Sequence, residues 1–134
     1  TVWDGTQWRS NIHVADIADL YMTLLDAPYL GPKGYNATAG NHTAYTLALI
    51  VADEFGKETG IRPALIVDKD KRDGRHYLMD ASLLTKDIGW SPKRTIAEAV
   101  RDNIAFFAAG GLKSPDDPIY VNTRRMADFM RQGV

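Results

Sequence analysis

The sequence predicts a mixed α/β fold made of several helices and short strands. Segments rich in β-prone residues alternate with segments whose apolar residues recur at helical spacing. None of the expected strands has the long Val/Ile run of a central parallel strand. With 134 residues, 45% hydrophobic and 25% charged, the chain has the size and composition of one ordinary globular domain. We therefore expect a lesser part of an α/β protein rather than its main sheet.

The N-terminal third predicts a hairpin, a strand and a helix. Residues 1–8 form two β-prone arms around Asp4-Gly5, a dipeptide that tight hairpins favour because both turn residues take positive φ. Asn11–Val14 reads as a short strand. Asp16 is expected to cap a helix that ends at Pro28. The apolar face of this helix comprises Ile17, Leu20, Tyr21, Leu24 and Leu25.

The middle of the chain predicts strand, helix, strand and a charged loop. Gly34–Ala39 is expected to be a short strand. Thr43–Lys57 is apolar nearly all round, which predicts a buried helix, and Gly60 is a suitable stop. Pro63–Val67 is expected to be a strand that leads into the mixed-charge loop Asp68–Arg75.

Further helices follow this loop. Ser82–Ile88 is expected to be a short helix that ends at Gly89. Thr95 and Glu98 have the spacing of a capping box, in which each side chain binds an otherwise unpaired backbone N–H at the start of a helix. The apolar stripe of that helix comprises Ile96, Val100, Ile104 and Phe107, and Gly110-Gly111 closes it.

We divide the chain into a folded part over residues 1–112 and a linker with a C-terminal helix over residues 113–134. The last helix is expected over Thr123–Arg131, with Met126, Phe129 and Met130 on one side. This tail either covers an apolar patch or joins a homodimer interface, and the sequence leaves both alternatives open.

Composition excludes several function classes. Lys plus Arg is 16 against 17 for Asp plus Glu, a formal charge of −1, which disfavours nucleic acid as a partner. The absence of cysteine rules out disulfides, thiolate metal sites and cysteine nucleophiles, and it is compatible with a reducing, cytoplasmic location. The longest nearly apolar run, Ala44–Ala52, is far shorter than the roughly 20 residues that span a bilayer, so no membrane partner is expected.

Common catalytic and cofactor motifs do not occur in the sequence. The glycines contain no Gly-x-Gly-x-x-Gly and no phosphate-loop spacing, and there is no Gly-x-Ser-x-Gly. Tyr29 and Lys33 have the Tyr-x-x-x-Lys spacing of hydride-transferring enzymes, but Gly31 and Pro32 between them break helices, so the match is a coincidence. The histidines are scattered and predict no metal site: His13, His42 and His76.

Three features retain a functional alternative. Arg9 either aims a guanidinium into a cleft or lies on the surface. Asn41 and His42 lie in the turn after the Tyr35-Asn36 segment, where helix capping is the simpler explanation.

The third feature is the loop Lys69–Arg75. A mixed-charge loop is usually only solvated. Alternatively, Arg75, together with Lys71 or Arg72, grips a diphosphate, because the planar fork of arginine binds phosphate oxygens bidentately.

Four blocks of sequence, in order, resemble the extended short-chain dehydrogenase/reductases, the NAD-dependent nucleotide-sugar epimerases and dehydratases. The resemblance runs over roughly residues 2–107 and covers only the C-terminal part of that family. The blocks are Gly5-Thr-Gln-Trp-Arg9 with Ile12–Ala18, Tyr35-Asn36 with Asn41, Asp73–Ser82, and Gly89-Trp90-Ser-Pro92, and Thr95–Phe107 is similar to the closing helix.

The resemblance implies that this chain binds substrate and that another part of the protein binds the cofactor and carries out the reaction. The family's Gly-rich cofactor loop and catalytic Tyr-x-x-x-Lys lie in its N-terminal Rossmann part, so this chain would hold no complete Rossmann sheet, no catalytic residue and no cofactor-binding residue. NAD or NADP would serve the full-length isomerase or lyase only, and this segment alone would be inactive. By resemblance, Arg9 and Arg75 contact the diphosphate of a nucleotide-diphosphate sugar, and Asn11, Asn41 and Asp73 line the nucleotide or ribose side.

The sequence also departs from the family pattern. Ser10 replaces the usual Asp after the arginine, and Leu83-Leu84 replaces the Lys that commonly follows Ser82. Two other functions therefore remain: a stand-alone module that binds a nucleotide or a protein without catalysis, or a shared fold with a lost function. The chain begins at Thr1 rather than Met, from which we expect a processed or trimmed product or a piece of a longer protein.

Overall fold

The computed structural model describes residues 1–134 except 29–30, 72, 113, 115 and 133–134. Its contacts define two units, Thr1–Ile104 and Ala105–Val134, and the predicted division at residues 112 and 113 stays a prediction. The predicted mixed α/β class is confirmed. The elements, in chain order, are β1 (Val2–Trp3), β2 (Trp8–Asn11), α1 (Val14–Asp26), β3 (Gly40–Thr43), α2 (Ala44–Thr59), β4 (Val67–Asp68), α3 (Ser82–Ile88), α4 (Ile96–Ala108), the 3-10 turn η1 (Pro118–Tyr120) and α5 (Asn122–Gln132).

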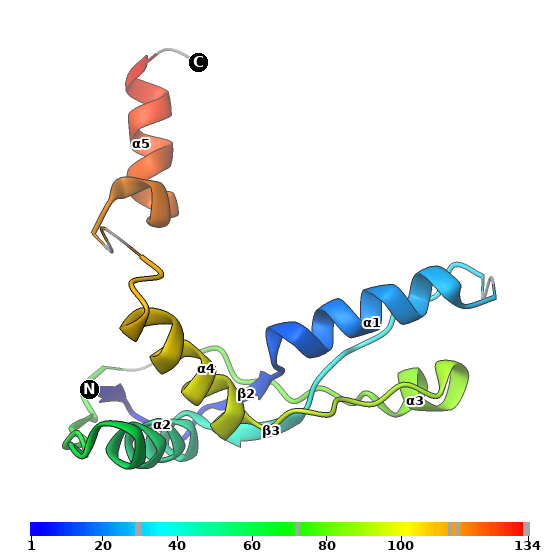
Figure 1. The fold of residues 1–134 in the computed structure, drawn as a ribbon, viewed down its shortest axis with the longest axis horizontal. Coiled ribbons are helices and arrows are strands. Elements are labelled where there is room, and N and C mark those ends of the chain that lie inside the picture. The colour runs from blue at the N-terminus through cyan, green and yellow to red at the C-terminus, as the bar shows by residue number, and fades with distance from the viewer. Residues whose placement is uncertain (29–30, 72, 113, 115, 133–134) are drawn as a thin grey trace. The chain divides into compact units, whose positions relative to one another are not determined.

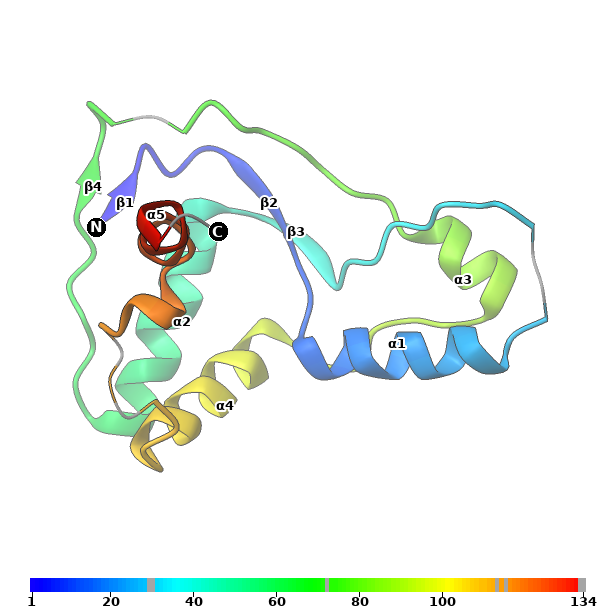
Figure 2. The same cartoon turned by 90° about the horizontal axis from the view of Figure 1, so that it is seen from above.

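The strands of the first unit form two separate pairs, visible in Figure 2. β2 and β3 are antiparallel, with Trp8 opposite Thr43. β1 instead pairs in parallel with β4, so the predicted hairpin across residues 1–8 is wrong. The turn itself has the predicted conformation, because φ is +57° at Asp4 and +90° at Gly5.

The other strand predictions are displaced. No residue of Gly34–Ala39 belongs to a strand. Strand β3 forms directly after this segment, at Gly40–Thr43. Of Pro63–Val67 only the last residue enters β4, consistent with the missing N–H of proline. Asn11–Val14 is wrong as a strand because Asn11 ends β2 and the helix α1 begins at Val14.

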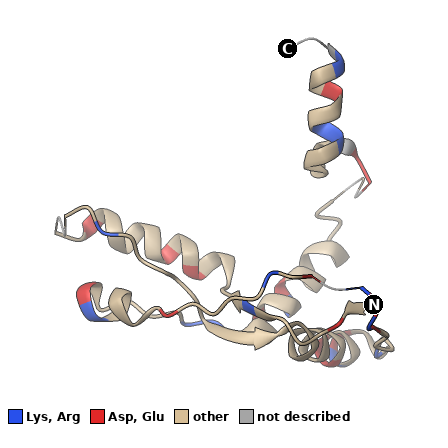
Figure 3. Ribbon diagram, turned by 180° about the vertical axis from the view of Figure 1, so that it is seen from behind, with Lys and Arg blue, Asp and Glu red and all other residues tan. Residues whose placement is uncertain are grey.

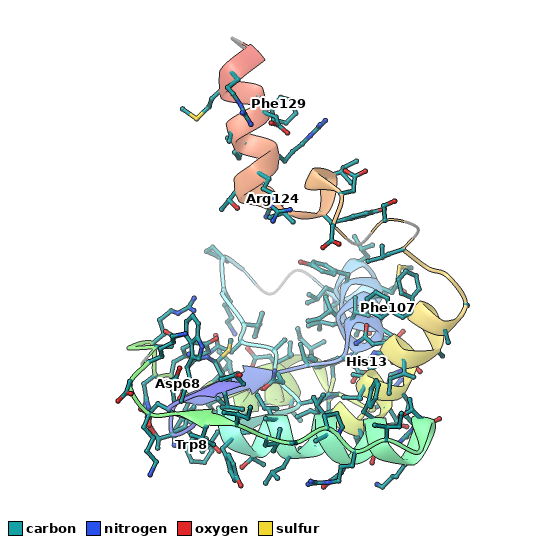
Figure 4. The ribbon with its side chains drawn as sticks, turned by 90° about the vertical axis from the view of Figure 1, so that its left-hand side faces the viewer. Trp8, His13, Asp68, Phe107, Arg124 and Phe129 are labelled. Atoms are coloured by element: carbon teal, nitrogen blue, oxygen red, sulfur yellow. The ribbon has the colours of Figure 1, made fainter. Side chains whose placement is uncertain are left out.

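Helix α1 begins one turn earlier than predicted, because His13 and not Asp16 is its N-cap. The His13 Nδ1 atom accepts a hydrogen bond from the Ala15 N–H at 3.1 Å. Its Nε2 lies 3.1 Å from the Asp102 carboxylate of α4, so the buried ring joins the two helices (Figure 4).

The main apolar core of the first unit lies between α1 and α3. Leu20 of α1, Leu84 of α3 and Trp90 are buried together, with half-buried apolar side chains around them. Figure 1 shows α1 and α3 at the same end of this unit. Helix α3 has the predicted bounds, and Gly89 ends it with φ +73°.

Helix α2 is capped by Thr43, whose hydroxyl accepts from the Thr46 N–H, so the capping role considered for Asn41 and His42 is wrong. The helix ends at Gly60 as predicted. It is not buried nearly all round: its buried residues are Ala52 and Glu54, whereas large apolar side chains remain exposed. The exposed ones are Tyr45, Val51 and Phe55.

Helix α4 carries the predicted capping box. The Thr95 hydroxyl accepts from the Glu98 N–H at 3.2 Å, and the Glu98 carboxylate accepts from the Thr95 N–H at 2.7 Å. In the second unit α5 extends the predicted Thr123–Arg131 helix by a residue at each end, and Arg125 stacks over Phe129 at 4.5 Å. Among the described residues, no helix is long and apolar enough to cross a membrane.

Candidate functional site

Arg9 is placed by strand β2 and held by several acceptors. Its Nη1 donates to the Trp8 carbonyl at 2.7 Å and to the Arg75 carbonyl, and its Nη2 donates to the Asp73 carboxylate at 2.8 Å. The side chain is only 18% exposed. Arg9 of strand β2 therefore contacts a loop that lies more than 60 positions later in the chain.

Asp73 bridges the two arginines that the sequence singled out. The Arg75 guanidinium binds this carboxylate with two nitrogens, Nε at 2.9 Å from Oδ1 and Nη2 at 2.6 Å from Oδ2. Hydrogen bonds from the Arg75 side chain and N–H, assisted by Arg9, hold the pKa of Asp73 well below its ordinary value although burial opposes this. The same contact raises the pKa of Arg75. We call Arg9, Asp73 and Arg75 the arginine cluster.

The two guanidiniums differ in access to water. The Arg75 side chain is 80% exposed, whereas Arg9 and Asp73 are 18% and 21% exposed. The cluster thus has a fixed inner cation and an outer cation that reaches solvent. Together with the carboxylate they carry a net charge of one positive unit, which suits an anionic ligand.

Asn41 fixes the segment that carries Asp73 and Arg75. Its Nδ2 donates to the Met79 carbonyl at 2.9 Å, and its Oδ1 accepts from the Met79 N–H at 3.0 Å. Ser10 donates to the same oxygen. The Asn41 side-chain amide therefore makes the two hydrogen bonds that the backbone of a neighbouring strand would make with Met79. These bonds join the segment after the loop to β3.

In the described part of the chain, no hydrogen bond or ion pair joins Asn11 or Lys71 to the arginine cluster. The Asn11 Oδ1 is buried and has no hydrogen-bond partner among the described residues. Lys71 is engaged elsewhere, with its ammonium 3.6 Å from Asp68 and over the Trp3 ring. Arg72, like Tyr29 of the rejected Tyr-x-x-x-Lys match, lies outside the described residues.

Tyr77 contacts the arginine cluster, although it is not among the candidates predicted from the sequence. Its ring lies 5.6 Å from the Arg9 guanidinium carbon, so the aromatic face supports the cation. A signal was present, because Tyr77 stands two positions after Arg75 in the block Asp73–Ser82.

A second charged group anchors the start of α4. Asp16 of α1 is buried and accepts from the Lys93 N–H at 3.1 Å, the Arg94 N–H at 3.0 Å and the Arg94 guanidinium at 2.6 Å. Burial opposes ionisation of this carboxyl, but the hydrogen bonds outweigh it and the pKa of Asp16 lies below its ordinary value. This contact is structural, since it joins α1 to the segment before α4.

A cavity of about 600 Å³ lies between α2 and the segment before α4, and no residue of the arginine cluster lines it. Several of its charged lining groups already form ion pairs, mostly with residues outside the cavity. Glu54 is paired with Lys57 and Arg101, and Arg94 is paired with Asp16. We therefore place the candidate site at the arginine cluster and not at this cavity.

Gly60 and Gly89 do not stand where the glycines of a dinucleotide cradle do. Such a cradle places glycines at the beginning of a helix, where N–H groups face the pyrophosphate, but Gly60 and Gly89 follow the ends of helices. Figure 3 shows acidic and basic residues interspersed along the first unit.

Among the described residues, no group of three His, Asp or Glu side chains could hold a metal ion.

Comparisons with known proteins show what the chain is similar to. No family model matches the chain. The chain is 35% identical over 103 residues to UDP-glucose 4-epimerase of Erwinia amylovora, and the match covers 74% of the chain and 29% of the relative. It is 31% identical over 109 residues to the probable GDP-L-fucose synthase 1 of Oryza sativa subsp. japonica, which covers 79% of the chain and 31% of the relative.

Solved structures agree. RMD from Pseudomonas aeruginosa, complexed with NADPH, matches with a TM-score of 0.59 and 25% identity over 75% of the chain and 32% of that structure. UDP-glucose 4-epimerase from Bifidobacterium longum, in complex with NAD+ and UDP, matches with a TM-score of 0.53 and 26% identity over 72% of the chain and 29% of that structure.

The fold is therefore that of the C-terminal portion of short-chain dehydrogenase/reductase structures. These relatives and structures match the extended branch of that family, as the resemblance predicted. It spans about 30% of the length of the curated relatives it matches.

Proposed function

We propose that this chain is the substrate-binding portion of an NAD- or NADP-dependent nucleotide-sugar epimerase or dehydratase. The observation that carries the proposal is the arginine cluster, in which Arg9 from β2 and Arg75 from a distant loop meet around one carboxylate. A nucleotide diphosphate presents oxygens to both guanidiniums, which bind such oxygens bidentately. Asn11, Asn41 and Asp73 line the nucleotide or ribose side, and Asn41 also holds the segment after the loop through Met79.

Binding at this cluster would act on catalysis through orientation. The diphosphate is remote from the reacting carbon of a sugar, so binding energy gained at Arg9 and Arg75 serves to position the sugar. The cofactor supplies hydride transfer, and its cradle and the catalytic residues belong outside this chain. We therefore expect the isolated chain to be inactive and to bind neither NAD nor NADP. A cytoplasmic location belongs to the same proposal.

Two features of the first unit support an additional protein part that packs against it. Helix α1 exposes apolar side chains that recur at helical spacing, a pattern typical of a face that another element covers. These side chains are Val14, Tyr21 and Leu25, which are 78%, 66% and 78% exposed. The segment Gly34–Ala39, which has the sequence of a strand, joins no ladder.

The role of Arg75 in substrate binding is tested by Arg75→Ala in a chain that also carries the N-terminal part. We expect KM for the nucleotide sugar to rise by about tenfold or more, because a bidentate arginine–phosphate contact is lost. Arg62→Ala is the matched control, since Arg62 is half exposed and pairs with Asp53 on another surface. An unchanged KM for Arg75→Ala would contradict the assignment.

The alternative is a stand-alone module that binds a nucleotide or a protein without catalysis. The two functions differ in the mass of the native protein, detected in source cells with an antibody against this segment. A protein much heavier than 14.9 kDa favours the enzyme, and a native mass near 14.9 kDa favours the module.

A further inference from the structure

The Asp73 carboxylate occupies the position that a ligand oxygen would take in the arginine cluster. Its Oδ2 atom accepts from Arg9 Nη2 at 2.8 Å and from Arg75 Nη2 and Nε at 2.6 and 3.2 Å. An oxygen that accepts from two guanidiniums has the charge and surroundings of a phosphoryl oxygen.

We propose that Asp73 is an exchangeable counter-ion: in the ligand-free protein it binds both arginines, and a phosphoryl oxygen of the ligand replaces it. The proposal rests on the proposed function only for the identity of the ligand. The exchange itself is a property of three side chains. While it binds the arginines, Asp73 competes with a phosphoryl oxygen; once replaced, it is free to line the nucleotide or ribose side, as in the proposed function.

The mobility that the exchange requires is consistent with where the groups lie. Asp73 and Arg75 are two residues apart in a loop, and the Arg75 side chain is mostly exposed, so it can turn from one anion to another without disturbing the core. Arg9 stays in place, because the Trp8 and Arg75 carbonyls and the Tyr77 ring hold its guanidinium independently of Asp73. The inner cation is thus fixed before a ligand arrives.

Asp73 has two effects while it remains in the cluster. It keeps the two cations, which would otherwise repel, close to one oxygen position, and it also competes with every anion that approaches. Because hydrogen bonds from Arg75 lower the pKa of Asp73, it is ionised at neutral pH and competes at full charge.

The test is a calorimetric titration of the chain with inorganic pyrophosphate, a probe without nucleoside or sugar. We expect Asp73→Asn to bind pyrophosphate about three- to tenfold more tightly than the unmodified chain, since it removes a competing charge but preserves shape. Asp53→Asn is the matched control, because it makes the same charge change in the exposed Asp53–Arg62 pair. We expect it to leave the affinity unchanged.

Equal or weaker binding by Asp73→Asn, or no binding of pyrophosphate by that variant, would overturn the proposal. Circular dichroism of the variant establishes that it is folded, and Asp73→Ala, which also removes the carboxylate, must show the same direction of change. A parallel titration with UDP separates the two claims. UDP binding without the gain for pyrophosphate overturns the exchange alone, whereas the gain without UDP binding overturns the proposed nucleotide ligand alone.

Discussion

Replacement of Asp16 by alanine should destabilise the first unit through one buried contact. The Asp16 side chain is 1% exposed and accepts three hydrogen bonds, from the Lys93 and Arg94 N–H groups and from the Arg94 guanidinium. Breaking a buried ion pair by removing one partner costs roughly 3–5 kcal/mol, because the remaining charge and N–H groups lose their acceptor.

The environment of Arg94 sets the expected value at the lower end of that range. Its side chain is 35% exposed and also contacts Asp19, so water and a second carboxylate compensate part of the loss. We expect Asp16→Ala to lower the free energy of unfolding by about 3 kcal/mol, measured by urea denaturation. Since a domain is typically stable by roughly 5–15 kcal/mol, this is a large effect.

A matched control lies on the same helix. Asp19 is 44% exposed and binds the same guanidinium at 3.1 Å, so Asp19→Ala should cost less than about 1 kcal/mol. If Asp16→Ala also cost less than about 1 kcal/mol, the buried contact would not anchor α4 and the reasoning would be refuted.

Two further predictions concern pH and helix capping. Because the pKa of Asp16 is lowered in the folded chain, the unfolded chain takes up its proton at higher pH; stability should fall as pH falls below about 5, and Asp16→Asn should flatten this dependence in urea denaturation at several pH values. An identical pH dependence in the variant would contradict this. Thr95→Ala should lower the free energy of unfolding by about 1 kcal/mol through loss of the capping box, while Thr95→Ser keeps it; equal losses in both would argue against a hydroxyl cap.

Local signals in the sequence predicted the helices well. The Thr95–Glu98 capping box and the glycine that ends α3 act within one turn of the chain, so their geometry follows from nearby residues. The positive φ of Asp4 and Gly5 was also predictable, because their side chains, or the lack of one, decide it locally.

Strand pairing was less predictable because a ladder needs a partner from elsewhere in the chain. The residues of β1 pair with β4, more than 60 positions away, and no local pattern specifies that choice. Likewise, the start of α1 depended on His13, whose ring binds both its own helix and Asp102. A histidine cap is uncommon, and the more usual Asp16 instead serves a distant contact.

The candidate site was visible in part. Arg9 and Arg75 could be selected from the sequence because the family resemblance marks them, and the structure brings them together. Asp73 was also selected, for the nucleotide or ribose side, but its role as the shared acceptor of the two arginines depends on how the loop folds back onto β2, as does the position of the Tyr77 ring. The two hydrogen bonds between the Asn41 side chain and Met79 could not be predicted, because they use the Met79 backbone, which carries no sequence signal.

Titration of the chain with UDP, GDP and dTDP in turn tests whether the arginine cluster binds a nucleotide diphosphate. We expect at least one of them to bind, Arg75→Ala to weaken that binding by about tenfold, and the exposed Arg62→Ala to leave it unchanged. Absence of binding by all three nucleotides, or equal binding by the unmodified chain and Arg75→Ala, would contradict the claim.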